Sequence, residues 1–365
     1  MRIYALLMAF VALLMGCDDR EPVVHGNAGW GTLPNAYADH FQVQIRGSDR
    51  RVLVFGAGGL QDTVGWYLLK GTPNGREEAI MVPLTRVAVV STTHLPFFTA
   101  LHVPEAIVGV AHSDAIRDPS MRGRVRSGAI SEITRAEGLD RERLIALAPQ
   151  ALFDYPFGRR PGQASVVPST IAVTEYLEQH PLGRAEWVRF FGLLLGREEE
   201  ADSLFAAIAH RYGTLRDMRT VLGTPPHVLF GSNWEKDWFA PPGNSYMAAL
   251  IHDAGGRYWF ADSATEGNIP MALEQVISIA DSCAYFGVVM AEEGRVDPLR
   301  MAGGDPRVAK LKALREGGFI GNSARSDLFG EALLEPEVML QDLRCIFYPR
   351  VCAGYRPTYF FPVGQ

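Results

Sequence analysis

The sequence lacks the short motifs that identify many enzymes. It contains no GxSxG nucleophile elbow, no HExxH metal site, no Walker A loop and no tight pair of carboxylates. Its nine histidines are scattered, and none lies four residues from another. A surface hydrolase using Ser91 and His94 is conceivable, but no partner acid can be assigned to this pair from the sequence. We therefore expect a protein that is not an enzyme.

The chain also lacks an excess of basic residues. It has 35 Lys and Arg against 41 Asp and Glu, a net charge of -6. A nucleic-acid partner would favour a basic face, so none is expected. The 365 residues are 47% hydrophobic and 21% charged, which is typical of globular proteins and long enough for two domains.

Cysteine is scarce, with four in the chain and no CxxC pair. Neither a zinc ribbon nor thioredoxin chemistry is therefore indicated. Cys345 and Cys352 are seven residues apart and could close a small loop in an oxidising compartment, although the spacing does not prove it. Cys283 lies in an apolar run, where we expect a small buried hydrophobic residue.

The N-terminus has the pattern of an export signal. Arg2 is followed by an apolar run from Ile3 to Met15, and LMGC ends at Cys17. About 13 apolar residues are too few for a membrane-spanning helix, which needs roughly 20. The LMGC string resembles a bacterial lipobox, which implies that residues 1–17 form a signal ending at a lipidated Cys17. An ordinary signal peptide with an incidental cysteine is the alternative.

Residues 18–40 are expected to form a polar tether between the anchor and the folded part. Asp18 resembles the retention signal that keeps lipoproteins at the inner membrane in some bacteria. The expected location is therefore the periplasmic side of a bacterial inner membrane, reached through a lipid anchor. Outer-membrane sorting stays open because that signal depends on lineage.

The remaining pattern predicts an α/β protein. FQVQI, GSDR and RVLVF read as a β-hairpin, and strand-like and helical runs alternate from Arg86 onward. GAGG at residues 56–59 is interpreted as a loop, because Gln61 stands where a dinucleotide fingerprint needs its third glycine. Alternation of this kind predicts a parallel sheet with helices on both faces, whose ligands gather at the carboxyl ends of the strands.

Two loops are thereby nominated as parts of a ligand cleft. Thr92, Thr93 and His94 follow the run RVAVV at a helix start, where hydroxyls and free N–H groups can receive a polar ligand. Plain helix capping by these side chains is the alternative. The second loop follows ALFD and combines aromatic rings with two cations, although it could be an ordinary solvated loop. Its candidate residues are Tyr155, Phe157, Arg159 and Arg160.

The middle of the chain contains a long helical pattern followed by an aromatic segment. Apolar residues recur at helical spacing from Arg184 to Arg219, about 36 residues or roughly 54 Å if unbroken. Gly192 and Gly196 could bend or interrupt it. Further on, tryptophans stand among prolines and polar residues after the strand HVLFG, which suggests a ligand wall. Trp234, Trp238 and Tyr246 are the candidates for this wall.

One short helix occurs twice in the sequence. ERLIALA at residues 142–148 aligns without a gap to EQVISIA at residues 274–280, with three of seven positions identical. Each copy is followed by a strand-like run, so the chain looks like two related α/β halves. Glu142 and Glu274 would then occupy equivalent positions, one in each half. Favourable interaction with the helix dipole is the simpler role for each glutamate.

These features together resemble a known family. RVAVVSTTHLPFFTALHVPEAIVGVA, GLDRERLIALAPQALF, GREEEADSLF and GNSYMAALIHDAGG occur in order, beside the lipobox and the long helix. The chain resembles the helical-backbone class of ABC-transporter substrate-binding proteins, which serve the uptake of ferric siderophores, haem and cobalamin. The resemblance implies two Rossmann-like lobes, each a sheet flanked by helices, with a ligand cleft between them. The expected parts are an N-terminal lobe at 41–183, a connecting helix at 184–220 and a C-terminal lobe at 221–365.

The resemblance also implies partners and roles. Glu142 and Glu274 match the glutamates that dock onto arginines of the permease, which works with an ATPase, and we expect a monomer. A stiff connecting helix predicts a small closure on binding. A ferric siderophore is the first candidate ligand, with haem and cobalamin behind it, and no resident cofactor or metal is expected. Zinc or manganese binding through scattered ligands, and a purely structural lipoprotein, are the alternatives.

Overall fold

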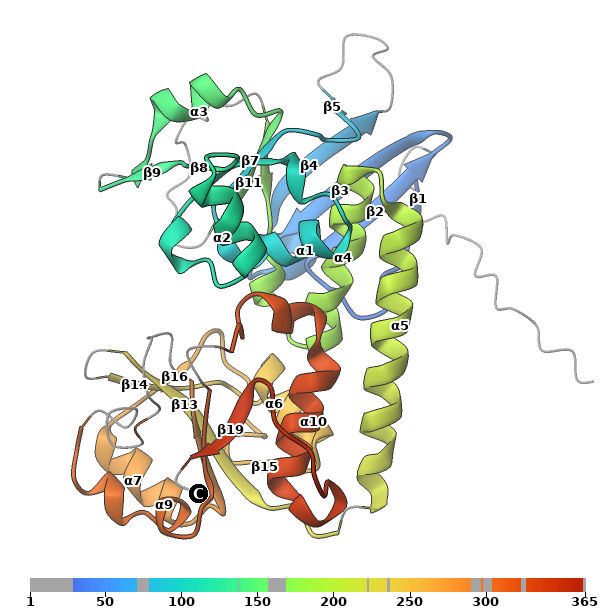
Figure 1. The fold of residues 1–365 in the computed structure, drawn as a ribbon. Helices are drawn as coiled ribbons and strands as arrows, with labels where there is room; N and C mark the ends of the chain where they lie inside the picture. Colours follow the sequence, from blue (N-terminus) through green and yellow to red (C-terminus); the bar gives the residue numbers. More distant parts are fainter. Residues whose placement is uncertain are drawn as a thin grey trace, which may run out of the picture.

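The computed structural model shows two α/β lobes joined along one side by a long helix, α5 (Figure 1). The structure describes residues 29–70, 79–136, 138–156, 169–221, 223–234, 237–289, 297, 304–322 and 326–363. No helix within these residues is long and apolar enough to cross a membrane. The two α/β lobes confirm the predicted fold class for the described part of the chain.

The N-terminal lobe is built on a five-stranded parallel sheet of order β12-β11-β6-β7-β8. Its central strands are fully buried apolar runs, as expected for a sheet covered on both faces. A two-stranded ribbon of β9 and β10 lies beside it. The elements are β6 Val87–Val89, α1 Leu95–Ala100, β7 Ile107–Val110, α2 Pro119–Arg126, β8 Ser131–Glu132, β9 Thr134–Arg135, β10 Gly138–Leu139, α3 Arg141–Leu147, β11 Ala151–Asp154 and β12 Thr170–Ala172.

A second, mostly antiparallel sheet precedes this core in the chain. The predicted hairpin is present: β2 and β3 pair from Phe41 with Val54 to Arg46 with Asp49. The inner face of the sheet packs on the lobe through Val52 and Val54, which are fully buried. Its strands are β1 Gly31–Leu33, β2 Phe41–Arg46, β3 Asp49–Phe55, β4 Thr63–Lys70 and β5 Ile80–Met81.

The helical stretch expected over Arg184 to Arg219 is two helices in the structure, interrupted at Gly196, one of the two glycines that could break it, so the connecting helix is only its second part. α4 (Pro181–Leu195) ends at Gly196, whose φ of 66° closes the helix in the left-handed region that glycine adopts without strain. α5 (Glu198–Asp217) starts afresh with three glutamates in its first turn, which favours a helix N-terminus. α4 packs inside the N-terminal lobe, while α5 alone runs on to the other lobe (Figure 1). At 20 residues α5 spans about 30 Å.

Two buried carboxylates at α4 hold the chain that leads into the lobe. Glu186 accepts hydrogen bonds from the backbone N–H groups of Ala36, Tyr37 and Ala38 at 2.7 to 2.9 Å. Glu178, just before the helix, accepts from the N–H groups of Asp39 and His40 and from the Trp187 indole. These contacts place part of the predicted tether, up to residue 40, within the folded lobe.

The C-terminal lobe has a mixed sheet of order β16-β14-β13-β17-β18-β19, with β15 also paired to β13. Strands β13, β15, β17 and β18 are parallel, and β14, β16 and β19 run antiparallel to their neighbours. Cys283 is buried beside this sheet, as predicted. The elements are β13 His227–Trp234, β14 Asp237–Ala240, α6 Tyr246–Asp253, β15 Arg257–Tyr258, β16 Ile269–Met271, α7 Leu273–Asp281, β17 Tyr285–Val288, α9 Lys312–Arg315, β18 Phe319–Asn322, α10 Pro336–Phe347 and β19 Phe360–Val363.

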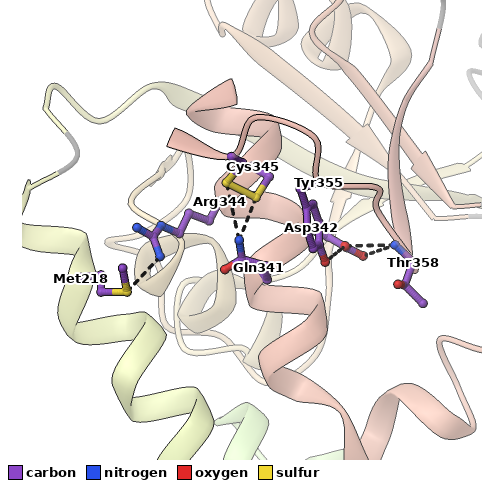
Figure 2. Close-up of a disulfide and its surroundings, with 8 residues drawn as sticks. Met218, Gln341, Asp342, Arg344, Cys345, Tyr355 and Thr358 are labelled. Carbon is purple, nitrogen blue, oxygen red and sulfur yellow. Dashed lines mark hydrogen bonds between the residues drawn. A yellow bond between two sulfur atoms is a disulfide. The ribbon is translucent and has the colours of Figure 1, made fainter. Parts of the chain in front are cut away.

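The C-terminal helix α10 is tied to the segment that follows it, which leads into β19, by a disulfide and a buried carboxylate (Figure 2). Cys345 and Cys352 are bonded, with their Cα atoms 5.4 Å apart. Asp342, fully buried, accepts from the Tyr355 hydroxyl at 2.7 Å and from the backbone N–H of Thr358 at 3.0 Å. α10 also packs along α5, so the connecting helix is braced within the C-terminal lobe.

Candidate functional site

A cavity of about 430 Å³ lies between the two lobes. It receives side chains from the carboxyl ends of strands in both, where a parallel α/β sheet places its ligands. Tyr176 follows β12 of the N-terminal lobe, and Ser232 belongs to the end of β13. The lining groups with polar chemistry include Tyr176, Glu178, Arg184, Ser232, Asn244 and Tyr246.

Arg184 is the cation of this interlobe cavity. It sits in the first turn of α4, and its guanidinium donates to the carbonyl of Tyr176 at 2.9 Å. The guanidinium carbon lies 4.1 Å from the ring centre of Tyr246, a cation–π contact that crosses from one lobe to the other. Its Nε is buried and has no hydrogen-bond partner among the described residues. A permanent cation with a free donor favours an anionic ligand group.

Neutral polar groups lie near this cation, and the carboxyl side chains of Glu178 and Glu266 also line the cavity. Burial raises the pKa of Tyr246, although the nearby Arg184 charge opposes the shift, so the phenol stays neutral and able to donate. The Oδ1 atom of Asn244 is buried without a partner among the described residues, which leaves an acceptor available. The ring of Tyr176 lies 4.4 Å from that of Tyr155, at a tilt of 46°. The predicted residues Tyr155 and Tyr246 thus lie at or beside the cavity.

The loop after β6 has a different role from the one predicted for it. The Ser91 hydroxyl accepts from the Thr93 N–H, which caps the short turn Thr92–His94, and the Thr93 hydroxyl donates to Glu175 at 2.7 Å. His94 is fully buried, and burial lowers its pKa to about 3. The prediction that His94 meets the ligand is therefore wrong, and the imagined hydrolase pair is not formed, because Ser91 bonds to Thr93.

Thr92 lines a second, smaller cavity of about 290 Å³ between the lobes. There Arg117 of the N-terminal lobe donates to the carbonyl of Ser326 at 2.6 Å, which links the two lobes directly. Asp327 and Glu331 add carboxylates to this second cavity. Burial raises the pKa of both, and the charge of Asp327 raises that of Glu331 further. The second cavity is lined by four acidic residues, Asp118, Asp327, Glu331 and Glu335, and by two arginines, Arg117 and Arg211.

The three residues of the predicted aromatic wall have different outcomes: Tyr246 lines the cavity, whereas Trp238 does not. Trp238 is 3% exposed and packs against Phe286 in the core of the C-terminal lobe, so its assignment to the cleft is corrected. Trp234 ends β13, and its side chain lies outside the described part. Phe157, Arg159, Arg160 and the proposed lipidation residue Cys17 also lie outside the described residues.

The two copies of the repeated helix are α3 and α7, and they occupy matching places in the lobes. Glu142 is the second residue of α3 and Glu274 the second residue of α7. Their side chains are 88% and 70% exposed, each beside an arginine: Arg135 at 3.6 Å and Arg307 at 3.2 Å. Figure 1 places both helices on the side of the molecule away from α5. Each lobe thus presents one accessible carboxylate at an equivalent point.

Residues 87–323 match the sequence profile of the periplasmic binding proteins. The chain belongs to this family of binding proteins. An uncharacterized lipoprotein of Methanocaldococcus jannaschii is 25% identical to this periplasmic binding protein over 299 residues, 78% of this chain and 70% of the relative. The family is a class of substrate-binding transport proteins, not of enzymes.

Two solved structures share the fold of this periplasmic binding protein. The triscatecholate siderophore binding protein FeuA of Bacillus subtilis, solved with ferri-bacillibactin, superposes with a TM-score of 0.57 at 14% identity. A periplasmic haem-binding protein of Pseudomonas aeruginosa gives 0.56 at 17% identity. In each case 75% of this chain and 95% of the other are covered.

Three cavity residues were missed by the sequence reasoning. Arg184 was hidden at the start of an apparently continuous helix, and Tyr176 and Asn244 stand in loops without a motif. The position of Tyr176 after the strand TIA was a usable signal, since ligands gather there. Among the described residues, no three His, Cys, Asp or Glu side chains gather closely enough to hold a metal ion.

Proposed function

We propose that this protein is the substrate-binding lipoprotein of an ABC importer, which captures a ferric siderophore and delivers it to the permease. The observation that carries the proposal is the cavity between the lobes, with Arg184 at its boundary and tyrosines on its walls. Its volume of about 430 Å³ is in the range of small-molecule sites, about 300 to 1,000 Å³.

The chemistry of the cavity supports an iron chelate as the cargo. Ferric siderophores of the catecholate type carry net negative charge and flat aromatic groups, which suit a cation flanked by phenol rings. FeuA, which has the same fold, was solved with such a chelate, and the Pseudomonas relative binds haem. Haem and cobalamin are the alternative ligands of the same site.

Delivery would use the exposed carboxylates of the two lobes. Glu142 and Glu274 would each meet an arginine of the permease, so that one charged contact per lobe sets the orientation of the complex. Arg135 and Arg307 hold these carboxylates until the permease arginines replace them. Since α5 is a continuous helix braced by α10, closure around the ligand is a small rotation and not a wide hinge movement.

The anchor in this proposal is a diacylated Cys17 on the outer face of the cytoplasmic membrane. The lipobox string LMGC supports it, and the Methanocaldococcus relative is described as a lipoprotein. A lipid anchor would keep the binding protein within reach of its permease at all times.

Tryptophan fluorescence titrations test the ligand class. Purified protein would be titrated with a ferric catecholate, a ferric hydroxamate, haem and cobalamin, and we expect saturable quenching by one of them at micromolar or lower concentration. Iron-free forms of the same siderophores serve as controls for non-specific quenching. Flat titrations with all four ligands would overturn the proposed cargo class, while leaving family membership untouched.

A further inference from the structure

The outer face of the N-terminal sheet exposes an unusual combination of side chains. Trp66 is 52% exposed and Val64 42% exposed, and both project from β4 away from the core. Three of the nine exposed large hydrophobic residues in the described part of the chain fall between Leu60 and Trp66. Val64 and Trp66 belong to β4 and the exposed Leu33 belongs to β1, so three of these nine residues lie in strands of this one sheet.

Arginines accompany two tryptophans on the same face: they cover Trp30, which is only 7% exposed, and Arg51 also lies beside the exposed Trp66. The guanidinium carbon of Arg51 lies 4.8 Å from the ring centre of Trp30 and 5.9 Å from that of Trp66. Arg46 lies 4.5 Å from the ring of Trp30 and keeps 47% of its side chain exposed. One carboxylate, Asp49, is 3.6 Å from Arg46. We call Trp30, Arg46, Arg51, Val64 and Trp66 the tryptophan–arginine face.

Pairing in the sheet keeps this face turned outward. Gln44, opposite Arg51 on β2, accepts a hydrogen bond from the Arg51 Nε at 2.7 Å, while Val52 on the reverse side of β3 is fully buried. Tyr67, next to Trp66, points inward and accepts from the Ala172 N–H at 2.7 Å. The alternation of β-strands therefore separates a core face from the tryptophan–arginine face.

We infer that the tryptophan–arginine face rests on the anionic headgroups of the membrane that holds the lipid anchor. Indole rings favour the boundary between headgroups and acyl chains, and guanidinium groups bind lipid phosphates. The chain carries a net charge of -6, so a locally cationic face is the part that an anionic surface attracts. The inference rests on the proposed anchoring at Cys17.

The length of the anchoring segment keeps the face close to the bilayer. Trp30 comes thirteen residues after Cys17, which limits their separation to roughly 45 Å even in a fully extended chain. The anchor thereby keeps the tryptophan–arginine face within reach of the membrane, so the effective concentration of lipid headgroups near this face is high. Figure 1 shows β1 and β2 on the α5 side, away from α3 and α7, so membrane contact and permease docking use different parts of the surface.

Quenching by brominated lipids tests this inference on the full chain. The protein would be purified from membranes and reconstituted into vesicles of phosphatidylglycerol and phosphatidylcholine with brominated acyl chains. We expect Trp66→Phe to remove most of the bromine-dependent quenching. Trp259→Phe is the matched control, because Trp259 is 41% exposed but belongs to the C-terminal lobe, and it should leave the quenching unchanged.

The dependence of Trp66 quenching on lipid charge distinguishes recognition of anionic headgroups from insertion of the side chain into any bilayer. Replacing phosphatidylglycerol by phosphatidylcholine, or combining Arg46→Gln with Arg51→Gln, should reduce the quenching of Trp66 several-fold. Arg197→Gln, an exposed arginine at the start of α5, should have no effect. Near-ultraviolet circular dichroism would check that each variant is folded, and Val64→Gln provides a second variant of the face.

Three results would overturn the inference: equal quenching in Trp66→Phe and Trp259→Phe, quenching that ignores lipid charge, or failure of the chain to associate with membranes. Concentration-dependent self-association that Trp66→Phe abolishes would also overturn it, by assigning the face to a second copy of the chain. The ligand titrations report on the interlobe cavity separately, so failure of the proposed cargo and failure of membrane contact give different results.

Discussion

Arg184 of α4 and Tyr246 of α6 meet face to face across the boundary between the lobes, with the guanidinium carbon 4.1 Å from the ring centre. Because Arg184 is the one lysine or arginine among the described residues that line the interlobe cavity, it is the group there best placed to bind an anionic cargo. We expect Arg184→Gln to weaken binding about ten- to hundredfold, the usual effect of losing one charged hydrogen bond. Fluorescence titration with whichever of the four candidate ligands quenches the unaltered protein measures this change.

The matched control for that variant is Arg197→Gln, which removes an exposed arginine from the start of α5 and should leave the dissociation constant unchanged. If Arg184→Gln binds the ligand as tightly as the unaltered protein, the cargo does not contact this cation.

Combined substitution of Glu142 and Glu274 by alanine should abolish uptake without changing ligand affinity. Both carboxylates are largely exposed and lie outside the interlobe cavity, so their loss removes docking contacts and no cargo contacts. Transport of the labelled ligand into cells, beside a titration of the purified variant, measures the two effects. Reduced affinity in the double variant would show that these residues act through the cleft or the fold.

Cys17→Ser should release the protein from its lipid anchor. Metabolic labelling with a radioactive fatty acid would be lost, since the thioether and amide acylation both require this cysteine. Cys283→Ser is the control, because Cys283 is buried in the C-terminal lobe and should not affect labelling. Unchanged labelling of the Cys17→Ser protein would exclude lipidation at this position.

Glu186→Ala should destabilise the N-terminal lobe strongly. The carboxylate is fully buried and accepts from three backbone N–H groups, which would be left without partners. A buried unpaired donor costs about 1 to 3 kcal/mol, and the Ala38 N–H is the buried one of the three, so a loss of about 1 to 3 kcal/mol in the free energy of unfolding is expected. Urea denaturation measures it, with Glu200→Ala, at an exposed position of α5, as the neutral comparison. Similar midpoints for the two variants would contradict the structural role of Glu186.

The contribution of Glu132 to the stability of the fold should depend on pH. Partial burial alone would raise its pKa, but hydrogen bonds from the Thr134 hydroxyl and the N–H groups of Ser113 and Thr134 outweigh it and lower the pKa to about 2. A lowered folded-state pKa means that the stabilisation is complete above the ordinary value of 4.5 and is lost as the pH falls toward 2.

Glu132→Gln imitates the protonated side chain and removes this dependence. The urea midpoint of the unaltered protein should exceed that of Glu132→Gln at pH 7, and the gap should narrow at pH 3. A gap that is constant across this range would show that the charge of Glu132 does not stabilise the fold.

The sequence predicted correctly those helices and strands that depend mainly on interactions between residues close together in the chain. The hairpin of β2 and β3 follows from alternating apolar residues around GSDR, and the repeated helix was visible because its apolar spacing survives in both copies. The break between α4 and α5 also had local signals, since Gly196 is followed by an arginine and three glutamates. Helical periodicity continues on both sides of the break because α4 and α5 pack against each other, so the sequence left open whether Gly196 bends or ends the helix.

The candidate site was less predictable, because the direction of a side chain depends on packing between distant segments. His94 follows a strand as a ligand-binding residue would, yet its ring points into the core beside Phe191. Trp238 alternates inward on β14 toward Phe286, which only the sheet order of the C-terminal lobe determines. Arg184 enters the cavity because α4 starts beside α6, a neighbour more than sixty residues later in the chain.

The two carboxylates at α4, Glu178 and Glu186, determine which part of the fold bears a pull on the tether. Tension transmitted from a membrane anchor would reach β1 first, which is held by only three residue pairs with β2. Beyond β1, the five consecutive backbone N–H groups from Ala36 to His40 donate hydrogen bonds to the carboxylates of Glu178 and Glu186. A pull on the tether is therefore borne by α4 and by Glu178, and because Glu178, His40 and Arg184 of α4 also line the interlobe cavity, movement of the tether is transmitted to the cavity wall.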